Sequence, residues 1–174
     1  MSTIATRRPE ASEFAEYYTG YISRVPDADV LTFLDAQLGS TVALLRGIDD
    51  AKGNHRYEAG KWSVKELLGH IIDGERVFSY RALVFARNDS TSLPGFDQDP
   101  WSQNANYANL TMKEIVDEFE AVRRSTILLF RHLDASAWDR VGVANNNRMT
   151  ARAAAFIIAG HTEHHLAILK SRYL

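Results

Sequence analysis

The stretch that decides the fold opens a helix and places a histidine on its apolar face: Trp62-Ser63-Val64-Lys65-Glu66-Leu67-Leu68-Gly69-His70. Ser63 and Glu66 have the spacing of a capping box, in which each side chain bonds the backbone N–H of the other. Trp62 and Leu67 form a hydrophobic staple around this start. Apolar residues then recur three and four positions apart, which predicts a helix that ends near Asn88, a residue suited to a left-handed C-cap.

Three further segments show the same periodicity. One follows Pro26, with Asp27 or Asp29 as its cap, and runs to about Ile48. Another begins with a second capping box, Thr111-Met112-Lys113-Glu114. The last starts after Thr150 and runs to the end of the sequence. With no strand-like alternation to compete, these segments predict an all-α protein, a four-helix bundle.

The remaining segments are expected to be an arm and two linkers. Residues 1–29 form an N-terminal arm, anchored on the bundle by Tyr17, Tyr18 and Tyr21. Residues 89–109 form a long loop, which either contributes to function or simply crosses the surface. A polar loop passes through Asn145-Asn146-Asn147. We expect the whole chain, residues 1–174, to be one domain.

Composition excludes several kinds of function. The formal net charge is −2, and no cluster of Lys and Arg appears, so nucleic-acid binding is not expected. The sequence contains no cysteine, which rules out disulfides, thiolate metal ligands and a cysteine nucleophile. No apolar run is long enough to cross a membrane, and no signal peptide is recognisable, so a cytoplasmic location is expected.

Three histidines fall on core-facing stripes of two of the predicted helices. His161 and His165 are four residues apart, so they project from one face of the last helix, and His70 lies on the second helix. Three buried imidazoles without partners would be costly, whereas one divalent metal accepts a lone pair from each. Three protein ligands also leave a coordination position for water or substrate, as in catalytic sites. We therefore expect His70, His161 and His165 to bind a metal.

Several neighbours of the trio carry secondary expectations. Asp73 could accept the second N–H of His70, while Glu163 should point away from the shared metal. His164 could substitute for His165, but its own helical row is not the apolar stripe, so it should lie outside the ligand set. Gly74 either leaves room beside His70 or permits close helix packing. Arg81 either binds an anionic substrate or, as we slightly favour, reaches solvent at the bundle end.

Three stretches together resemble the DinB family, of the superfamily that includes YfiT-like proteins and metal-dependent thiol transferases. They are residues 60–82, which contain Gly69-His70, the segment Leu93-Pro94-Gly95-Phe96-Asp97, and residues 158–169, which contain Gly160-His161-Thr162-Glu163-His164-His165. The resemblance implies a bundle with up-down-down-up connectivity, a three-histidine site holding nickel or zinc, and frequent homodimers. The matching positions here are His70, His161 and His165.

The expected function is that of a metal-dependent enzyme. We favour a thiol S-transferase that acts on small electrophiles. Because the chain lacks cysteine, a low-molecular-weight thiol would enter as cosubstrate. The alternatives are a metal-dependent hydrolase and a non-catalytic, metal-containing binding or stress-response protein. A homodimer is also expected, because three tryptophans and a tyrosine-rich arm exceed what the core needs.

Overall fold

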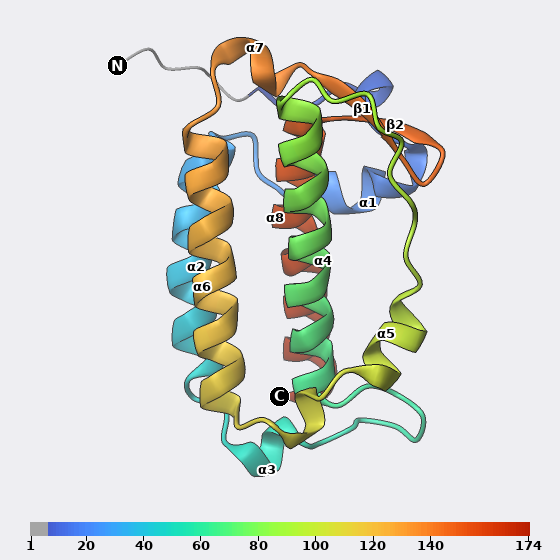
Figure 1. Cartoon of the computed structure of the whole chain (residues 1–174). Helices are drawn as coiled ribbons and strands as arrows, with labels where there is room; N and C mark the ends of the chain where they lie inside the picture. Colours follow the sequence, from blue (N-terminus) through green and yellow to red (C-terminus); the bar gives the residue numbers. More distant parts are fainter. Residues whose placement is uncertain (1–6) are drawn as a thin grey trace.

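The computed structural model describes residues 7–174, so the first part of the predicted arm lies outside the described residues. Four long helices form the bundle (Figure 1): α2 (Val30–Leu45), α4 (Val64–Ala86), α6 (Met112–Arg131) and α8 (Ala151–Ile168). The chain runs one way along α2 and α8 and the opposite way along α4 and α6 (Figure 1), so the up-down-down-up connectivity and the four-helix bundle are confirmed.

The predicted helix starts are confirmed by their caps. Ser63 and Glu66 form a capping box at α4, and Thr111 and Glu114 form another at α6. Asp29 caps α2, and Thr150 caps α8 by accepting from the N–H of Ala153. These side chains bond backbone N–H groups that have no partner inside a helix, and so fix where each helix begins.

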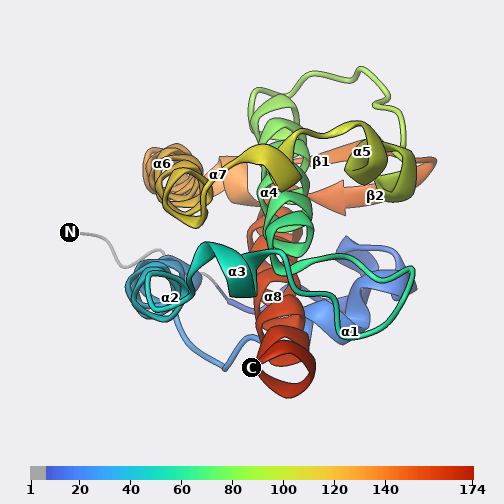
Figure 2. The same ribbon diagram turned by 90° about the horizontal axis from the view of Figure 1, so that it is seen from below.

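The arm before α2 contains 3₁₀ turns at Ala11–Glu13 and Glu16–Tyr18 and the short helix α1 (Thr19–Ile22). The long helices are connected by segments that contain α3 (Asp50–Gly53), α5 (Gln98–Asn104), a 3₁₀ turn at Tyr107–Asn109 and α7 (Ala135–Trp138). Viewed along the bundle (Figure 2), α2 and α6 lie on one side and α4 and α8 in the centre. The arm with α1, the segment with α5 and a small sheet lie beyond α4 and α8, on the side away from α2 and α6 (Figure 2).

The prediction of no strands is wrong. The loop before α8 contains a hairpin of β1 (Val141–Ala144) and β2 (Asn147–Thr150), paired antiparallel. Its two-residue turn is Asn145-Asn146, and both residues have positive φ, 50° and 60°. A type I′ turn requires this conformation, and asparagine tolerates it better than most residues.

Helix α8 is the central element of the core. Every residue from Ala151 to Thr162 is buried, because α4, α2 and the arm cover different faces of the helix. The backbone of Tyr21 lies so close to Gly160 that a β-carbon there would collide with the Tyr21 carbonyl oxygen. The arm thus packs directly against α8, beside His161. After Ile168, the chain continues as a π-helical turn, Leu169–Tyr173.

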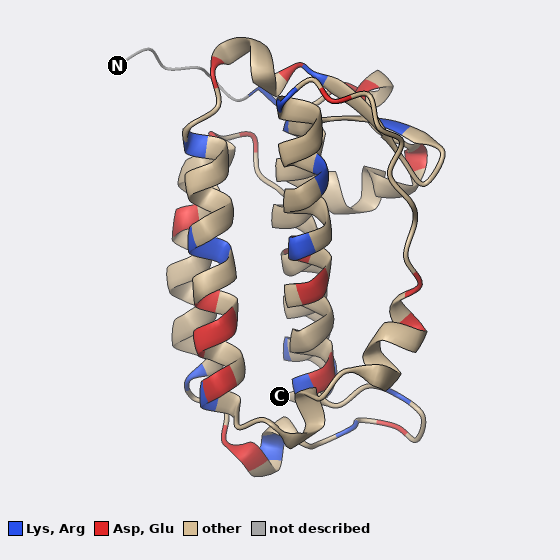
Figure 3. Cartoon of the chain, in the orientation of Figure 1, with Lys and Arg blue, Asp and Glu red and all other residues tan. Residues whose placement is uncertain are grey.

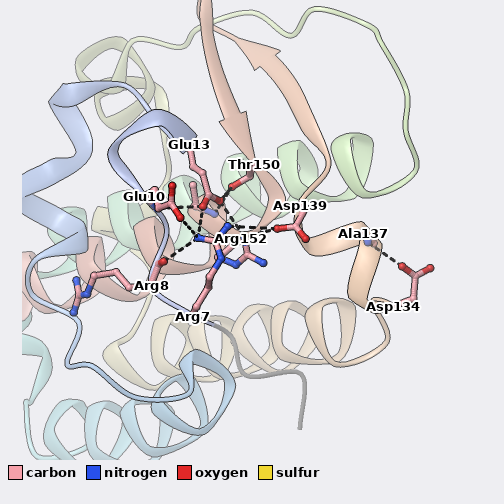
Figure 4. Close-up of polar contacts among 10 residues, drawn as sticks. Arg7, Arg8, Glu10, Glu13, Asp134, Ala137, Asp139, Thr150 and Arg152 are labelled. Carbon is pink, nitrogen blue, oxygen red and sulfur yellow. Dashed lines mark hydrogen bonds and ion pairs between the residues drawn. The ribbon is translucent and has the colours of Figure 1, made fainter. Parts of the chain in front are cut away.

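A polar cluster holds the start of the described arm to the end of the hairpin (Figure 4). The carboxylate of Glu13 accepts from Arg7 at 2.5 Å, from the Thr150 hydroxyl at 2.8 Å and from Arg152 at 3.1 Å. Arg152 also donates to Asp139 at 2.6 Å. Of the expected arm anchors, Tyr18 and Tyr21 pack inward, whereas Tyr17 is 75% exposed.

The structure shows the mixed distribution of charged residues that the sequence indicated. Acidic and basic residues are interspersed along α4 and α6 (Figure 3). No helix in the described part of the chain is long and apolar enough to span a membrane.

Candidate metal centre

The three predicted histidines converge between α4 and α8. Nε2 of His70 lies 2.9 Å from Nε2 of His161, and Nε2 of His165 lies 3.1 Å from that same atom. One ligand nitrogen from each ring lies within 4.8 Å of the others, and all three residues are buried. The convergence expected from the helical faces is therefore present.

Gly74 allows this close approach. It lies one turn after His70 on α4, and a β-carbon at this position would be 3.1 Å from Cε1 of His161. The missing side chain thus lets the His161 ring sit against the α4 backbone. Gly74 also lines the cavity in front of the rings, so both uses considered for this residue apply.

Burial keeps the imidazoles neutral near pH 7. It lowers the pKa of His70 to about 4 and that of His165 to about 3. Burial also lowers the pKa of His161, and the nearby histidines and the Arg123 cation add to that shift. A neutral ring has a lone pair available for a ligand bond.

Hydrogen bonds alone do not satisfy the trio. A ring nitrogen carries either one proton or one lone pair, so Nε2 of His161 can form one good hydrogen bond at a time. It nevertheless has two close Nε2 neighbours. A single cation that accepts three lone pairs would fit this donor set.

Aromatic rings surround the trio. The Trp62 ring lies 4.8 Å from the ring of His70, centroid to centroid, and Tyr21 meets His161 edge-on at 5.4 Å. His164 is half-buried and faces Tyr21 at 5.3 Å, so it lies outside the converging set, as expected.

The two nearby acids differ in position. Glu163 points away from the trio, as predicted, and its Oε1 accepts a 2.7 Å hydrogen bond from Gln37 on α2. Asp73 borders a small cavity together with His70, but its Oδ1 accepts from the hydroxyl of Tyr107 at 3.1 Å. Its predicted hydrogen bond to His70 is absent from the contacts between described residues.

An ion pair that the sequence reasoning missed lies in the bundle core. Arg123 of α6 donates from Nε and Nη2 to the Glu75 carboxylate of α4, at 2.8 Å each. It also donates to Gln37 of α2 at 2.5 Å and to the Thr162 hydroxyl of α8 at 2.9 Å. The available signal was an arginine within the apolar periodicity of α6, facing a glutamate beside Gly74.

A cavity of about 350 Å³ opens onto His70 and His161. We call it the main cavity. Its walls come from α4, the arm, the loop before α5 and the hairpin, and include Tyr18, Tyr21, Phe78, Arg81, Phe96 and Asn145. The long loop and the polar loop of the sequence therefore both contribute to the site. Neither contribution could be read from helical periodicity.

The favoured expectation for Arg81 is wrong. Its side chain does not reach solvent at the bundle end, because it is 3% exposed and lines the main cavity. Nη2 donates to the carbonyl of Pro94 at 3.0 Å, which ties the loop to α4. The guanidinium lies over the Phe78 ring, 5.0 Å from its centroid.

Comparisons with known proteins agree with this architecture. A family model of the DinB superfamily matches residues 34–169. A protein of Oceanobacillus iheyensis named "Putative metal-dependent hydrolase" is 26% identical over 135 residues, which cover 77% of this chain and 76% of that protein.

A solved structure has the same fold. YfiT from Bacillus subtilis, described as a probable metal-dependent hydrolase with an unusual four-helix bundle topology, matches with a TM-score of 0.66 at 18% identity. The match covers 97% of this chain and 94% of YfiT. On the strength of the family model, the chain belongs to the DinB superfamily.

Proposed function

We propose that this protein is a metal-dependent hydrolase in which His70, His161 and His165 hold one divalent metal ion. The observation that carries the proposal is the convergence of three buried imidazoles, with Nε2 separations of 2.9 and 3.1 Å, at the end of an open cavity. The two close Nε2 neighbours of His161 and the lowered pKa values of the three rings suit such an ion. Nickel and zinc both accept imidazole ligands, and the donor set fits either.

A divalent cation bound by three neutral histidines supplies a Lewis acid and lowers the pKa of a water molecule that it binds. The residues of this chain prepare the place for that chemistry. Trp62 packs on His70 and Tyr21 on His161, so two of the rings are held in orientation. Gly74 leaves the space in front of them free.

The names of relatives favour hydrolysis over thiol transfer. The Oceanobacillus protein is named a "putative metal-dependent hydrolase", and YfiT is described as a "probable metal-dependent hydrolase". Applied to this chain, that description is a proposal. It agrees with a main cavity that offers room for one small substrate.

A second cavity keeps thiol S-transfer as an alternative. About 300 Å³ in volume, it reaches His165 and is lined by Tyr57, Lys61, Trp62 and Tyr173. It lies towards the start of α4, whereas the main cavity lies towards the end of that helix. Two cavities that reach the same three histidines would suit the two substrates of S-transfer, a thiol and an electrophile. Because the chain has no cysteine, the thiol would have to come from a separate molecule.

The test combines metal analysis with a substrate panel. The protein is loaded with nickel or zinc, its metal content is measured, and esters, amides and phosphoesters are assayed with and without low-molecular-weight thiols. We expect one metal per chain and hydrolysis that needs no thiol. His161→Ala should lose both, whereas His132→Ala, at the exposed end of α6, should lose neither.

Other outcomes would contradict the proposal in different ways. Consumption of electrophiles only when a thiol is present would replace hydrolysis with S-transfer. If the protein binds no divalent metal at a stoichiometric level, both metal-dependent hydrolysis and metal-dependent S-transfer are refuted.

A further inference from the structure

We propose that Arg81 anchors a negatively charged group of the substrate, so that the main cavity takes small molecules with an oxyanion, a carboxylate or a phosphate, on an apolar body. The inference rests on the proposed function, because it concerns the substrate of the same site. Nothing in the family match or the relatives' names assigns a role to this residue.

Arg81 is a buried cation without an acidic partner. The other two buried arginines of the described chain are both neutralised: Arg123 by Glu75, and Arg152 by Glu13 and Asp139. No carboxylate of the described residues lies within ion-pair distance of Arg81. A buried, unpaired charge is costly, so its presence at a cavity wall points to a partner that binds there.

The guanidinium faces the main cavity with donors to spare. Arginine has five N–H donors, and the Pro94 carbonyl accepts one of them at 3.0 Å. Burial raises the pKa of the Tyr18 hydroxyl, whereas the Arg81 charge and a hydrogen bond from Arg81 lower it, so this hydroxyl accepts a second donor of the guanidinium. The remaining donors are available for a bidentate bond to a carboxylate or phosphate, which is the interaction arginine forms best.

Aromatic rings define the rest of the ligand. The Arg81 guanidinium lies 5.0 Å from the centroid of Phe78 and 6.0 Å from that of Phe96, which holds it in place. Tyr18 and Tyr21 complete an aromatic wall. Such walls bind an apolar, preferably flat, body. Asp97 is the other charged residue of the cavity lining, but it is exposed, and its Oδ1 accepts from the N–H of Asp99.

The spacing fits a small molecule. Arg81 follows His70 by eleven positions on α4, so their α-carbons are roughly 16 Å apart at about 1.5 Å per residue. The Arg81 side chain packs on Phe78, which precedes it on the helix, so its charge lies closer to the trio than its α-carbon does. A ligand can therefore place its oxyanion on Arg81 and its reacting bond at the histidines.

The experiment measures binding to protein stripped of metal, so that no cation can bind the probes. The probes are phenylacetate, phenyl phosphate and the neutral phenylacetamide, and the method is calorimetric titration. We expect at least one of the two anions to bind about tenfold or more tighter than the amide, as a charge-assisted hydrogen-bonded pair allows. Arg81→Met should abolish that preference, and Arg81→Lys should keep part of it.

Matched controls separate the possible failures. Arg87→Met removes an exposed cation just beyond the same helix and should bind all probes like the wild type. Circular dichroism verifies that each variant is folded. An anion preference that survives Arg81→Met, or an amide that binds as tightly as both acids, would overturn the inference.

Metal content makes the two proposals distinguishable. Arg81→Met should keep wild-type metal stoichiometry, because Arg81 is not part of the trio. His161→Ala should lose the metal yet keep the preference for anions. If the wild type binds no metal but prefers anions through Arg81, then the hydrolase proposal fails and the Arg81 anchor stands as an anion-binding site.

Discussion

Arg123 donates to both carboxylate oxygens of Glu75, and the two side chains are 0% and 2% exposed. The same guanidinium reaches Gln37 and Thr162, so one residue from each of the four bundle helices meets at this point. Glu75 follows Gly74, and Thr162 follows His161. The network thus fixes α4 and α8 relative to each other where the histidines must converge.

Breaking this pair from one side should be strongly destabilising. Glu75→Gln leaves the Arg123 charge buried without its counterion, and we expect a loss of about 3–5 kcal/mol in the free energy of unfolding. Denaturant titration measures it. Glu120→Gln, which weakens surface ion pairs with Arg124 and Arg46, serves as the control and should leave the midpoint nearly unchanged, because such pairs contribute little. Equal effects of the two substitutions would show that the buried network does not stabilise the fold.

Local sequence signals predicted the helices and the trio because they act over a few residues. Ser63, Thr111 and Thr150 mark helix starts through bonds to residues three positions away. His161 and His165 share a face because of helical geometry alone. Such features need no knowledge of the rest of the fold.

What the sequence did not reveal depends on contacts between distant segments. Arg123 and Glu75 are 48 positions apart, and nothing local shows that they meet. Arg81 is buried with the help of the loop at Pro94 and Phe96, which folds back over α4. The hairpin was not predicted because its strands have only four residues each, although the run Asn145-Asn146-Asn147 indicated its turn.

Gly74 should be required for the geometry of the trio. Gly74→Ala introduces a β-carbon 3.1 Å from Cε1 of His161, so the ring must shift by a few tenths of an ångström. We expect weaker metal binding, by about tenfold or more, as changes beside metal ligands typically produce. Competition with a chelator measures the affinity. Gly39→Ala on α2, where nothing lies within 4 Å of the new methyl group, should bind metal normally.

Stability of the metal-free protein should fall on mild acidification. The folded pKa values of His70 and His165 are about 4 and about 3, below the value near 6.5 of an unfolded chain. The unfolded state therefore binds more protons below pH 6.5, and stability present above that pH is lost progressively towards pH 4.

Urea titrations of chelated protein between pH 7.5 and 5.5 test this, because most carboxylates remain ionised in that range. His165→Ala should give a shallower decline. A free energy of unfolding that stays constant over this range would contradict the assignment of three neutral, buried imidazoles.

A homodimer stays a prediction, but fewer aromatic residues are available for an interface than the sequence suggested. Trp138 is buried and stacks on Phe130, and Trp62 packs on His70, so neither is available for an interface core. Trp101, Tyr17 and Tyr80 keep large exposed areas, of 46%, 75% and 56%. Aromatic residues are enriched at interfaces. Light scattering across a wide concentration range should give the mass of a dimer, and a constant monomer mass would refute it.

Loss of the metal should leave the bundle folded. The capping boxes at Ser63 and Thr111 and the Glu75–Arg123 pair act without the ion, and the core extends along the whole of α8. Small domains whose folding depends on zinc lack such a core. His161→Ala and chelated wild-type protein should therefore keep their helical circular dichroism.

Both should nevertheless melt at a lower temperature than the loaded protein, because an ion that binds only the native state stabilises it by mass action. The variant should not respond to added nickel or zinc, whereas the chelated wild type should recover its melting temperature. Complete unfolding of the wild type on chelation would instead assign the ion a structural role, since a site that only supports catalysis does not hold the fold together.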